Sequence, residues 1–470
     1  MRFLVFITMA VVFAYTANGQ DCNCESNFEW LKKTFEENDA GFQYIIDKKG
    51  QAAYDVHNQM MLEKIKEAKT PTECAKLLSE WLKFFRSGHI WIQLMSPTIN
   101  ETGEYKSEMW EGDISQFEKY IATKKGADFE GVWETSPYKI GIKKEGANYI
   151  GFIIESGVES WKQGMVKLKI KQADDKLEST FYMRDHSIDE SDNPKLVGKN
   201  YLQIGQWTLK RLSPFFPPDS LGNYYESMNA EKPYLEELNA NTLYFRIPSF
   251  AGREKSAIDS VIAVNKDKIL KTKNLIIDVR YNGGGNDDSY YELLPFLYTN
   301  PIRTIELEYL STQHNNQRML DISASTNDEK EKQRFKEEYD TLQSRLGEFV
   351  NLDGETVSIR RYDTIYEYPK YVGIIVSKEC GSTTEQFLLD AKQSKKVKVF
   401  GTNTFGAIDF SNMYSAESPC KEFMLGYCLT RRLWVPNVTI DNVGLQPDFY
   451  LDESIPPYKW VEFVNETLNQ

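Results

Sequence analysis

The chain has 470 residues, of which 41% are hydrophobic and 27% are charged, and its formal net charge is -13. This length and apolar content allow about two or three domains with buried cores and exclude a disordered chain. The acidic balance argues against nucleic acid or an anionic membrane as a partner, because phosphate contacts need a concentrated basic patch. The runs KIKQ and QSKK are too short to form one.

Residues 1–19 have the pattern of a secretory signal peptide. Arg2 precedes an apolar run over residues 3–15, and Ala17-Asn18-Gly19 supplies small residues for cleavage. No later segment approaches ~20 consecutive apolar residues, the length needed to span a bilayer. We therefore expect an exported protein, periplasmic or secreted, without a transmembrane segment.

The cysteines form an even set, which in an exported chain indicates disulfides. They are Cys22, Cys24, Cys74, Cys380, Cys420 and Cys428. The pairing that we expect first is Cys420 with Cys428. The alternative is zinc, but no CxxC pair stands with histidines at ligand spacing, so we expect neither a metal nor another cofactor.

The N-terminal half changes from helical to strand-like patterns. Residues 20–88 predict a helical N-terminal module, because NFEWLKKTF, YDVHNQMMLEKIKEA and PTECAKLLSEWLKFF carry apolar residues at spacings of three to four. Residues 89–235 predict a β-rich domain, since HIWIQL, YIGFIIES, MVKLKIKQ and STFYMRD are short β-branched and aromatic runs between polar turns.

Strands and helices alternate over residues 236–470, which predicts an α/β core. The apolar strands TLYFRIPSF and NLIIDVR flank a helix expected over about 254–270. A charged helix over about 327–349 interrupts this core, and its many Glu/Lys pairs suit an exposed insertion.

Ser382 stands at a sharp turn between a buried strand and a helix. The strand is YVGIIVS, and the helix that follows places Phe387, Leu388 and Ala391 on one face. A hydroxyl at this position could act as a nucleophile, because the first free N–H groups of the helix can stabilise an adjacent oxyanion. The alternative is structural, since Ser382-Thr383-Thr384-Glu385 also reads as a capping box.

A glycine-rich segment, NLIIDVRYNGGGN, follows another buried strand. It contains neither GxxxxGK[ST] nor a GxGxxG that opens a helix, so a nucleotide loop is not indicated. The N–H of Gly284 or Gly285 could instead supply one half of an oxyanion hole, with the N–H of Thr383 as the other half. We expect Asp278 and Arg280 to pair with each other or with neighbouring loops.

Four pieces of the chain follow one another within about residues 243–452: YFRIPSF, IIDVRYNGGG, GSTTEQF followed by VFGTNTFG, and VGLQPDFYL. Together they resemble the tail-specific, or C-terminal-processing, serine proteases, which include the tricorn core. The resemblance implies a crotonase-like (ClpP/crotonase-type) α/β protease core. Such proteases often carry a PDZ-like domain, but the sequence has no clear PDZ carboxylate loop, so a PDZ-like and a barrel-like form both stay open for the β-rich middle domain.

The processing branch of this family activates its serine with a lysine that follows the TxG turn, but this chain has Ala407 there. Another base is needed, because a serine hydroxyl is a poor nucleophile without one. The histidines are His57, His89, His186 and His314. His89, in RSGHIWIQL, resembles the DGH-type motif that supplies the catalytic histidine in the tricorn-like branch. That branch also takes a glutamate from just before its C-terminal motif, and Asp441 stands at the matching place.

The resemblance thus implies an exported serine peptidase that acts on peptide or protein substrates through an acyl-enzyme. Ser382 would be the nucleophile, His89 the general base and Asp441 the residue that orients His89. The alternative is a non-catalytic peptide-binding or apolar-ligand-binding protein on the same fold, which the loss of the lysine at Ala407 motivates. A carbohydrate-processing enzyme has no support beyond the many acidic residues.

Overall fold

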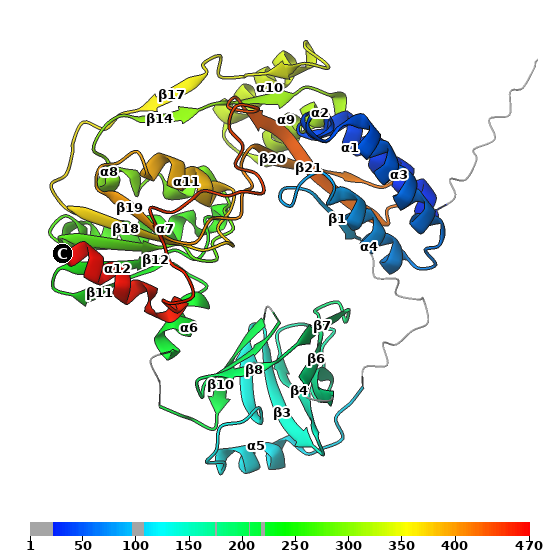
Figure 1. Cartoon of the computed structure of the whole chain (residues 1–470), viewed down its shortest axis with the longest axis vertical. Helices are drawn as coiled ribbons and strands as arrows, with labels where there is room; N and C mark the ends of the chain where they lie inside the picture. Colours follow the sequence, from blue (N-terminus) through cyan, green and yellow to red (C-terminus); the bar gives the residue numbers. More distant parts are fainter. Residues whose placement is uncertain (1–21, 96–107, 174–175, 206, 218–220) are drawn as a thin grey trace, which may run out of the picture. The chain divides into compact units, whose positions relative to one another are not determined.

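The computed structural model describes residues 22–95, 108–173, 176–205, 207–217 and 221–470 (Figure 1). It divides into unit 1 (Met1–Ser96, Tyr309–Val350 and Asn412–Thr430) and unit 2 (Pro97–Glu308, Asn351–Ser411 and Arg431–Gln470). The predicted signal peptide, residues 1–19, lies outside the described residues. Within the described ranges, no helix is both long enough and apolar enough to cross a membrane.

Unit 1 packs helices against a five-stranded sheet. The helices are α1 (Cys24–Asn38), α2 (Phe42–Lys49), α3 (Gln51–Lys66), α4 (Pro71–Leu82), α9 (Gln313–Ser325) and α10 (Glu329–Gln343). The sheet has the order β1 (Trp91–Leu94), β21 (Phe423–Arg432), β15 (Leu307–Leu310) and β16 (Phe349–Val350), with β20 (Phe410–Glu417) paired to β21.

The helices predicted for residues 20–88 share one apolar core with this sheet. Phe35 and Trp81 from the helices belong to the same buried cluster as Leu425 and Tyr427 of β21. The predicted charged helix is α10, in which Arg334 pairs with Glu331 and Glu338, at 3.0 Å each. Unit 1 is therefore assembled from three separated segments, whereas the predicted domains at 20–88, 89–235 and 236–470 follow the chain; those boundaries stay predictions.

The expected Cys420–Cys428 disulfide is wrong. Cys22 pairs with Cys420, and Cys24 pairs with Cys74, while Cys380 and Cys428 are buried thiols. Cys428 lies five residues inside the extended strand β21, at roughly 3.3 Å per residue. That distance from the preceding turn, which contains Cys420, exceeds the separation that a disulfide can bridge.

Unit 2 contains a nine-stranded antiparallel sheet over much of the strand-rich middle region, whereas HIWIQL, the first strand predicted there, contains β1 of unit 1. The order of the nine-stranded sheet is β7 (Ile188–Asp192), β6 (Lys176–Tyr182), β5 (Val166–Ala173), β4 (Asn148–Ser156), β3 (Tyr138–Glu145), β2 (Gly131–Thr135), β10 (Trp207–Ser213), β9 (Tyr201–Ile204) and β8 (Lys195–Val197). The helix α5 (Ile114–Ala122) contributes Phe117 and Ile121 to a small buried cluster with Phe152. The PDZ-like or barrel-like character of this domain stays a prediction.

The predicted α/β region contains a six-stranded sheet. Its order is β11 (Tyr234–Asn239), β12 (Thr242–Arg246), β13 (Asn274–Asp278), β18 (Tyr371–Val376), β19 (Val397–Gly401) and β22 (Phe449–Tyr450). From β12 to β22 each neighbouring pair is parallel, and β11 is an antiparallel edge. Around it lie α6 (Gly222–Met228), α7 (Lys255–Ile269), α8 (Leu294–Leu297), α11 (Thr383–Ala391), α12 (Trp460–Asn469), the 3-10 helices η1 (Gly252–Glu254), η2 (Asp287–Tyr290) and η3 (Pro457–Lys459), and the pair β14 (Ile302–Ile305) and β17 (Val357–Arg360).

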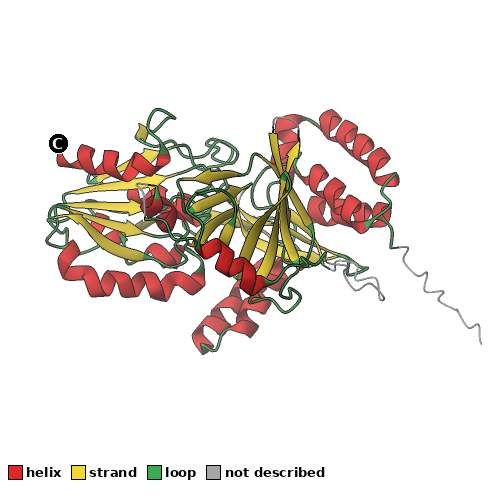
Figure 2. Cartoon of the chain, turned by 90° about the horizontal axis from the view of Figure 1, so that it is seen from below, coloured by secondary structure: helices red, strands yellow, loops and turns green. Residues whose placement is uncertain are grey.

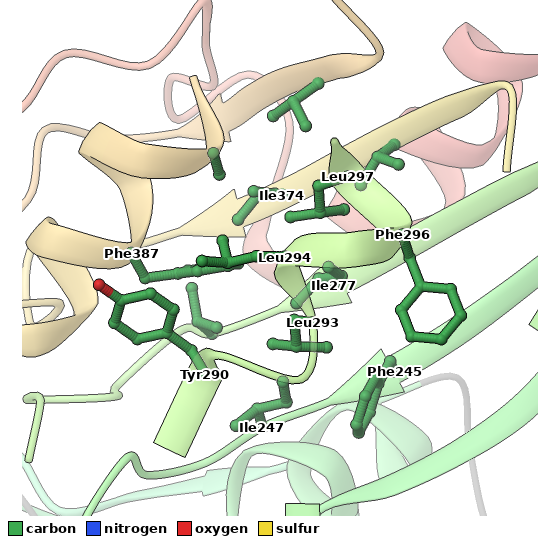
Figure 3. Packing of buried hydrophobic residues seen from close by; sticks show 14 of the residues in the cluster. Phe245, Ile247, Ile277, Tyr290, Leu293, Leu294, Phe296, Leu297, Ile374 and Phe387 are labelled. Carbon is green, nitrogen blue, oxygen red and sulfur yellow. The ribbon is translucent and has the colours of Figure 1, made fainter. Parts of the chain in front are cut away.

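The two faces of this sheet are buried against different helices. Ile277 of β13 belongs to a large cluster with Phe387 of α11, both labelled in Figure 3. Ile258 of α7 is part of the same cluster. Ile276, the residue before Ile277, faces the other way and packs with Val464 of α12. Figure 2 shows the helix that ends at the C-terminus on one side of the sheet and a longer helix on the other. Because parallel strands end at the same edge, the segments that follow β13, β18 and β19 gather there.

Candidate active site

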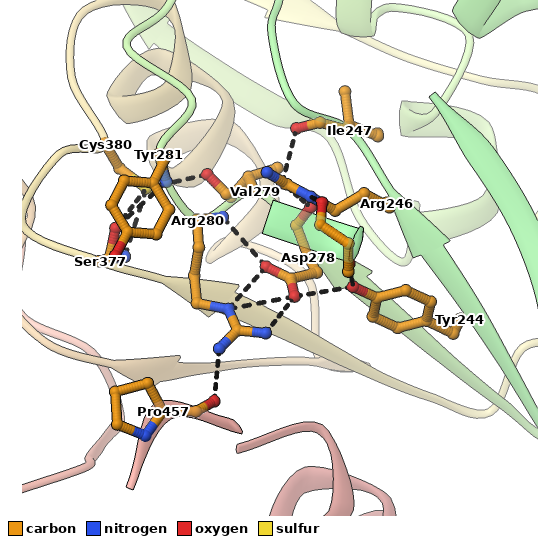
Figure 4. Close-up of polar contacts among 11 residues, drawn as sticks. Tyr244, Arg246, Ile247, Asp278, Val279, Arg280, Tyr281, Ser377, Cys380 and Pro457 are labelled. Atoms are coloured by element: carbon orange, nitrogen blue, oxygen red, sulfur yellow. Dashed lines mark hydrogen bonds and ion pairs between the residues drawn. The ribbon is translucent and has the colours of Figure 1, made fainter. Parts of the chain in front are cut away.

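Ser382 closes the turn between β18 and α11. Cys380 braces this turn, since its N–H donates to Ser377 O (3.0 Å) and its Sγ donates to Val279 O (3.0 Å), contacts drawn in Figure 4. Ser382 has φ 55° and ψ -124°, and it forms a capping box with Glu385, whose carboxylate accepts the N–H of Ser382 (3.1 Å). An ordinary N-cap residue is extended instead. A strained serine between strand and helix is the geometry of a nucleophile turn, so Ser382 has the backbone of a nucleophile while it also caps α11.

Glu385 ties this turn to the loop after β19. Its fully buried carboxylate accepts the N–H of Ser382 (3.1 Å), the N–H groups of Gly406 and Ala407 (both 2.8 Å) and the hydroxyl of Thr404. Burial raises the pKa of Glu385, and these hydrogen bonds oppose that shift. The sequence predicted the capping box of Ser382 and Glu385, but the contacts of Glu385 with residues 404–407 are long-range and were missed.

The glycine-rich segment lies against the turn. A β-carbon built on Gly284 would fall 2.7 Å from Ser382 Cβ and 2.9 Å from Thr383 N, so only glycine fits there. The N–H of Gly284 donates to Asn282 Oδ1 (3.0 Å), which removes it as an oxyanion donor. Gly284 therefore permits the close approach instead of donating.

The N–H groups of Thr383 and Gly285 are the better pair of donors. Thr383 is the first residue of α11, where the helix offers no acceptor to its N–H. Gly285 forms a parallel bridge with Phe250, in which its own N–H points away from Phe250. No hydrogen bond described for the chain uses either group as a donor. Two unengaged N–H groups beside one serine can stabilise an oxyanion.

Asp441 is held in the same edge of unit 2. Its Oδ1 accepts the N–H groups of Ile408 (2.7 Å) and Asp409 (2.8 Å). In the reverse direction, Asp409 Oδ2 accepts the N–H groups of Ile440 (2.8 Å) and Asp441 (2.9 Å). These reciprocal bonds fix the orientation of the Asp441 carboxylate. The buried Asp409 was not singled out from the sequence, and only its position within an apolar run could have indicated it.

His89 lies in unit 1, at the turn between α4 and β1, with φ 58°. Arg86 braces this turn, because its Nε donates to Gly88 O (3.2 Å) and its guanidinium pairs with the buried Asp39 (Nη1 to Oδ1, 2.8 Å). The thiol of Cys428 donates to His89 O (3.4 Å). The conformation of His89 is therefore set by its own unit.

The other three histidines have structural contacts. His57 Nε2 lies 3.1 Å from Trp81 O, His314 Nδ1 lies 2.6 Å from the Tyr427 hydroxyl, and the His186 ring stacks on Trp161 at 4.2 Å. Burial lowers the pKa of each of these imidazoles. These contacts give the three rings structural roles in the packing around them.

Asp278 and Arg280 form the predicted structural pair. Arg280 Nη2 donates to Asp278 Oδ2 (2.6 Å), and its Nη1 donates to Pro457 O (2.7 Å), as Figure 4 shows. Burial acts to raise the pKa of Asp278, but the charge of Arg280 outweighs it and holds that pKa below its usual value. The pair is thus ionised, mutually neutralised and separate from the serine turn.

Comparisons with known proteins address the segment that holds these residues. Residues 241–451 match the model of Peptidase family S41. A search among curated proteins finds no match to this chain. The segment includes Ser382, Asp441 and the glycine-rich loop, and it excludes His89.

Solved structures match over nearly the whole chain at low identity. Mature CPAF matches with a TM-score of 0.53 at 12% identity, over 95% of this chain and 96% of that chain. Mature CPAF complexed with lactacystin gives the same score and identity, over 95% and 97%. The tricorn protease matches with a TM-score of 0.42 at 11% identity, over 95% of this chain and 36% of that chain. The CPAF likeness shows a shared fold.

Proposed function

This chain belongs, through residues 241–451, to peptidase family S41, the tail-specific protease family, and is a serine-type peptidase; on that premise we propose that Ser382 is its nucleophile. The observation that carries this proposal is the strained turn at Ser382, packed against Gly284 beside the unengaged N–H of Thr383. A peptidase needs a hydroxyl and oxyanion donors at one place, and this turn supplies both.

The proposed reaction is acyl transfer to water. Ser382 Oγ attacks the peptide carbonyl while His89 takes its proton, and the N–H groups of Thr383 and Gly285 stabilise the resulting oxyanion. His89 then gives the proton to the leaving amine, and water resolves the acyl-enzyme by the reverse sequence. Asp441 orients His89, and Ala407 in place of a lysine is the reason for assigning the base to a histidine.

The surrounding features extend this proposal. The parallel sheet β12-β13-β18-β19-β22 is the arrangement expected of the crotonase-like core. The sequence of residues 1–19 supports export, and two disulfides within unit 1 agree with an oxidising compartment. The substrates of a peptidase are peptides or proteins.

The test combines a digest with covalent labelling. The mature protein, its Ser382→Ala variant and a Ser260→Ala control, an exposed serine on α7, are incubated with a mixed peptide library and read by mass spectrometry. We expect cleavage by the mature protein and the control, and none by Ser382→Ala. A serine-directed fluorophosphonate probe should label Ser382, more slowly in His89→Ala.

Each other outcome points elsewhere. Equal cleavage by Ser382→Ala would mean that another residue is the nucleophile. Unchanged labelling in His89→Ala would remove His89 from the mechanism while leaving Ser382 in place. No cleavage and no labelling by any form would favour the non-catalytic binding protein.

A further inference from the structure

A cavity of about 340 Å³ lies on the α12 face of the six-stranded sheet, away from the Ser382 turn. Its walls come from α6, β11, β12, η3 and α12 and include four tyrosines, Tyr224, Tyr234, Tyr244 and Tyr458. This volume is within the range of sites for small ligands or a single side chain, which are commonly about 300–1,000 Å³.

The floor of the cavity is a chain of satisfied polar groups. Ser227 Oγ lies 2.5 Å from the Tyr244 hydroxyl, which donates to Asp278 Oδ2 (2.9 Å). Asp278 in turn accepts from Arg280, and Figure 4 shows Tyr244, Asp278 and Arg280 in this line. Burial raises the pKa of Tyr244 well above its ordinary value, so this phenol stays neutral.

Arg280 does not make the cavity a site for anions. Each of its three nitrogens donates within the protein, to Asp278 or to Pro457 O, and the Asp278 carboxylate neutralises its charge. The Arg280 guanidinium also lies over the Tyr224 ring, 5.2 Å from its centroid. A bound anion would therefore meet an ion pair that is already neutralised, whereas the aromatic wall already accommodates a cation.

The only other charges on the lining belong to Glu236 and Glu462, both exposed. Among the described residues, neither carboxylate forms an ion pair with a lysine or arginine within 4.0 Å. Two unpaired carboxylates and four tyrosines around an apolar space, which Leu238 and Val461 complete, complement a cation on an aliphatic stem.

We propose that this tyrosine-lined cavity binds a primary ammonium group carried on an aliphatic chain, the chemistry shared by a lysine side chain and a small alkylamine. The stem packs between Tyr224, Tyr234 and Tyr458, and the ammonium lies toward Glu236 and Glu462. The site is separate from the proposed catalytic residues, so it holds whether or not Ser382 is the nucleophile.

The test measures the binding of n-butylammonium by saturation-transfer NMR titration. Butyrate and 1-butanol, measured in the same way, are the comparators. We expect n-butylammonium to bind roughly tenfold more tightly than either comparator, a difference of about 1.4 kcal/mol. The Glu236→Gln/Glu462→Gln double variant should bind n-butylammonium about tenfold more weakly, and so should Tyr458→Ala. The matched controls are Glu453→Gln and Tyr450→Ala, exposed residues that do not line the cavity.

A capped peptide with one lysine, tested in the Ser382→Ala background, distinguishes the two sources. Binding of both probes supports a lysine side chain as the natural occupant, and binding of n-butylammonium alone supports a free amine. The proposal is overturned if butyrate or 1-butanol binds as tightly, if the double variant binds like the controls, or if neither ammonium probe binds.

Discussion

The backbone of Ser382 carries strain that a glycine would not. With φ 55° and ψ -124°, the residue occupies a region that side chains with a β-carbon rarely adopt. Such strain costs of the order of 1–3 kcal/mol and is found where a site requires it. Glycine relieves this strain in the folded state, but it also gives the unfolded chain more conformational entropy, which offsets part of the gain. We therefore expect Ser382→Gly to be more stable than Ser382→Ala by about 1 kcal/mol.

Urea unfolding of the two variants side by side measures this difference, since both lack the hydroxyl. If Ser382→Ala is equally or more stable, the turn is not strained and the case for a nucleophile turn loses its main support.

Glu385 is a positioning residue, because its carboxylate accepts four hydrogen bonds from two segments and so holds the Ser382 turn against residues 404–407. In Glu385→Gln, an NH2 group replaces one carboxylate oxygen. This donor then faces N–H groups that the oxygen had accepted, so those hydrogen bonds are lost. We expect kcat to fall about 100-fold with KM little changed, because small displacements of reacting groups have effects of this size. The exposed Glu355→Gln is the control. A fall in melting temperature with unchanged kcat and unchanged fluorophosphonate labelling would leave Glu385 a structural role only.

At the scale of elements, the turn between α4 and β1 depends on one buried ion pair. The side chains of Arg86 and Asp39 are 1% and 0% exposed, and Arg86 also binds the carbonyl of Gly88. Removing one partner leaves a buried charge, so we expect Arg86→Met to lower the free energy of unfolding by about 3–5 kcal/mol. Lys64→Met, which breaks the exposed pair with Glu80, should cost less than about 1 kcal/mol.

Chemical denaturation measures the free energy of unfolding of Arg86→Met, Lys64→Met and the double variant Arg86→Met/Asp39→Asn. The double variant should recover part of the loss, because it removes both charges. Equal effects of Arg86→Met and Lys64→Met would show that the buried pair contributes no more than a surface pair.

The elements that could be predicted are those whose pattern is local. The strands at β13 and β18 and the helix at α11 follow from apolar runs and spacing, and the Ser382 turn follows from their order. The joining of α1–α4 with β21 could not be predicted, because contacts between residues about 400 positions apart leave no mark on local spacing. The same reason explains the missed Cys22–Cys420 disulfide.

The sequence predicted which residue types form the candidate site, but it did not predict which backbone N–H groups serve as oxyanion donors. Gly284 lies close to Ser382, but its N–H, which the sequence offered as an oxyanion donor, is bound to Asn282. Which N–H groups are unengaged depends on the Asn282 side chain and on the bridge to Phe250, and neither follows from sequence spacing. For His89 the sequence indicates a turn but not the pair of Arg86 with Asp39 that braces it.

At the scale of the whole molecule, the pattern of thiols is directly measurable. Cys380 and Cys428 are buried, and burial raises the pKa of the Cys380 thiol to about 12, which suppresses its reactive thiolate. We expect iodoacetamide to modify neither cysteine in the native protein and both in denaturant. A non-reduced digest should contain the peptides Cys22–Cys420 and Cys24–Cys74. Native labelling of Cys380, or a Cys420–Cys428 peptide, would contradict this arrangement.

The stability of the molecule should depend on pH through Lys167, a lysine of β5 with no exposed surface. Its ammonium lies 3.8 Å from the Trp161 ring centroid and 4.0 Å from that of Tyr138, and it donates to Met183 O (3.3 Å). Burial lowers its pKa from 10.5 to about 7, although the charge of Asp185 opposes the shift. His186, stacked on Trp161, also has a pKa lowered by burial and by the charge of Lys167.

Between pH about 7 and about 10.5 the unfolded chain holds the Lys167 proton more tightly than the folded chain does. The free energy of unfolding should therefore rise with pH across this window, by at most about 5 kcal/mol, because a shift of one pKa unit corresponds to about 1.4 kcal/mol. Lys167→Met should remove this rise and be more stable than the wild type at pH 6, where the folded protein must bury the charge. Urea unfolding at pH 6 and pH 9 measures both effects, with Lys171→Met, an exposed lysine of the same strand, as the control. If Lys167→Met keeps the pH dependence of the control, the ammonium is solvated in the folded state and the aromatic contacts do not exclude water from it.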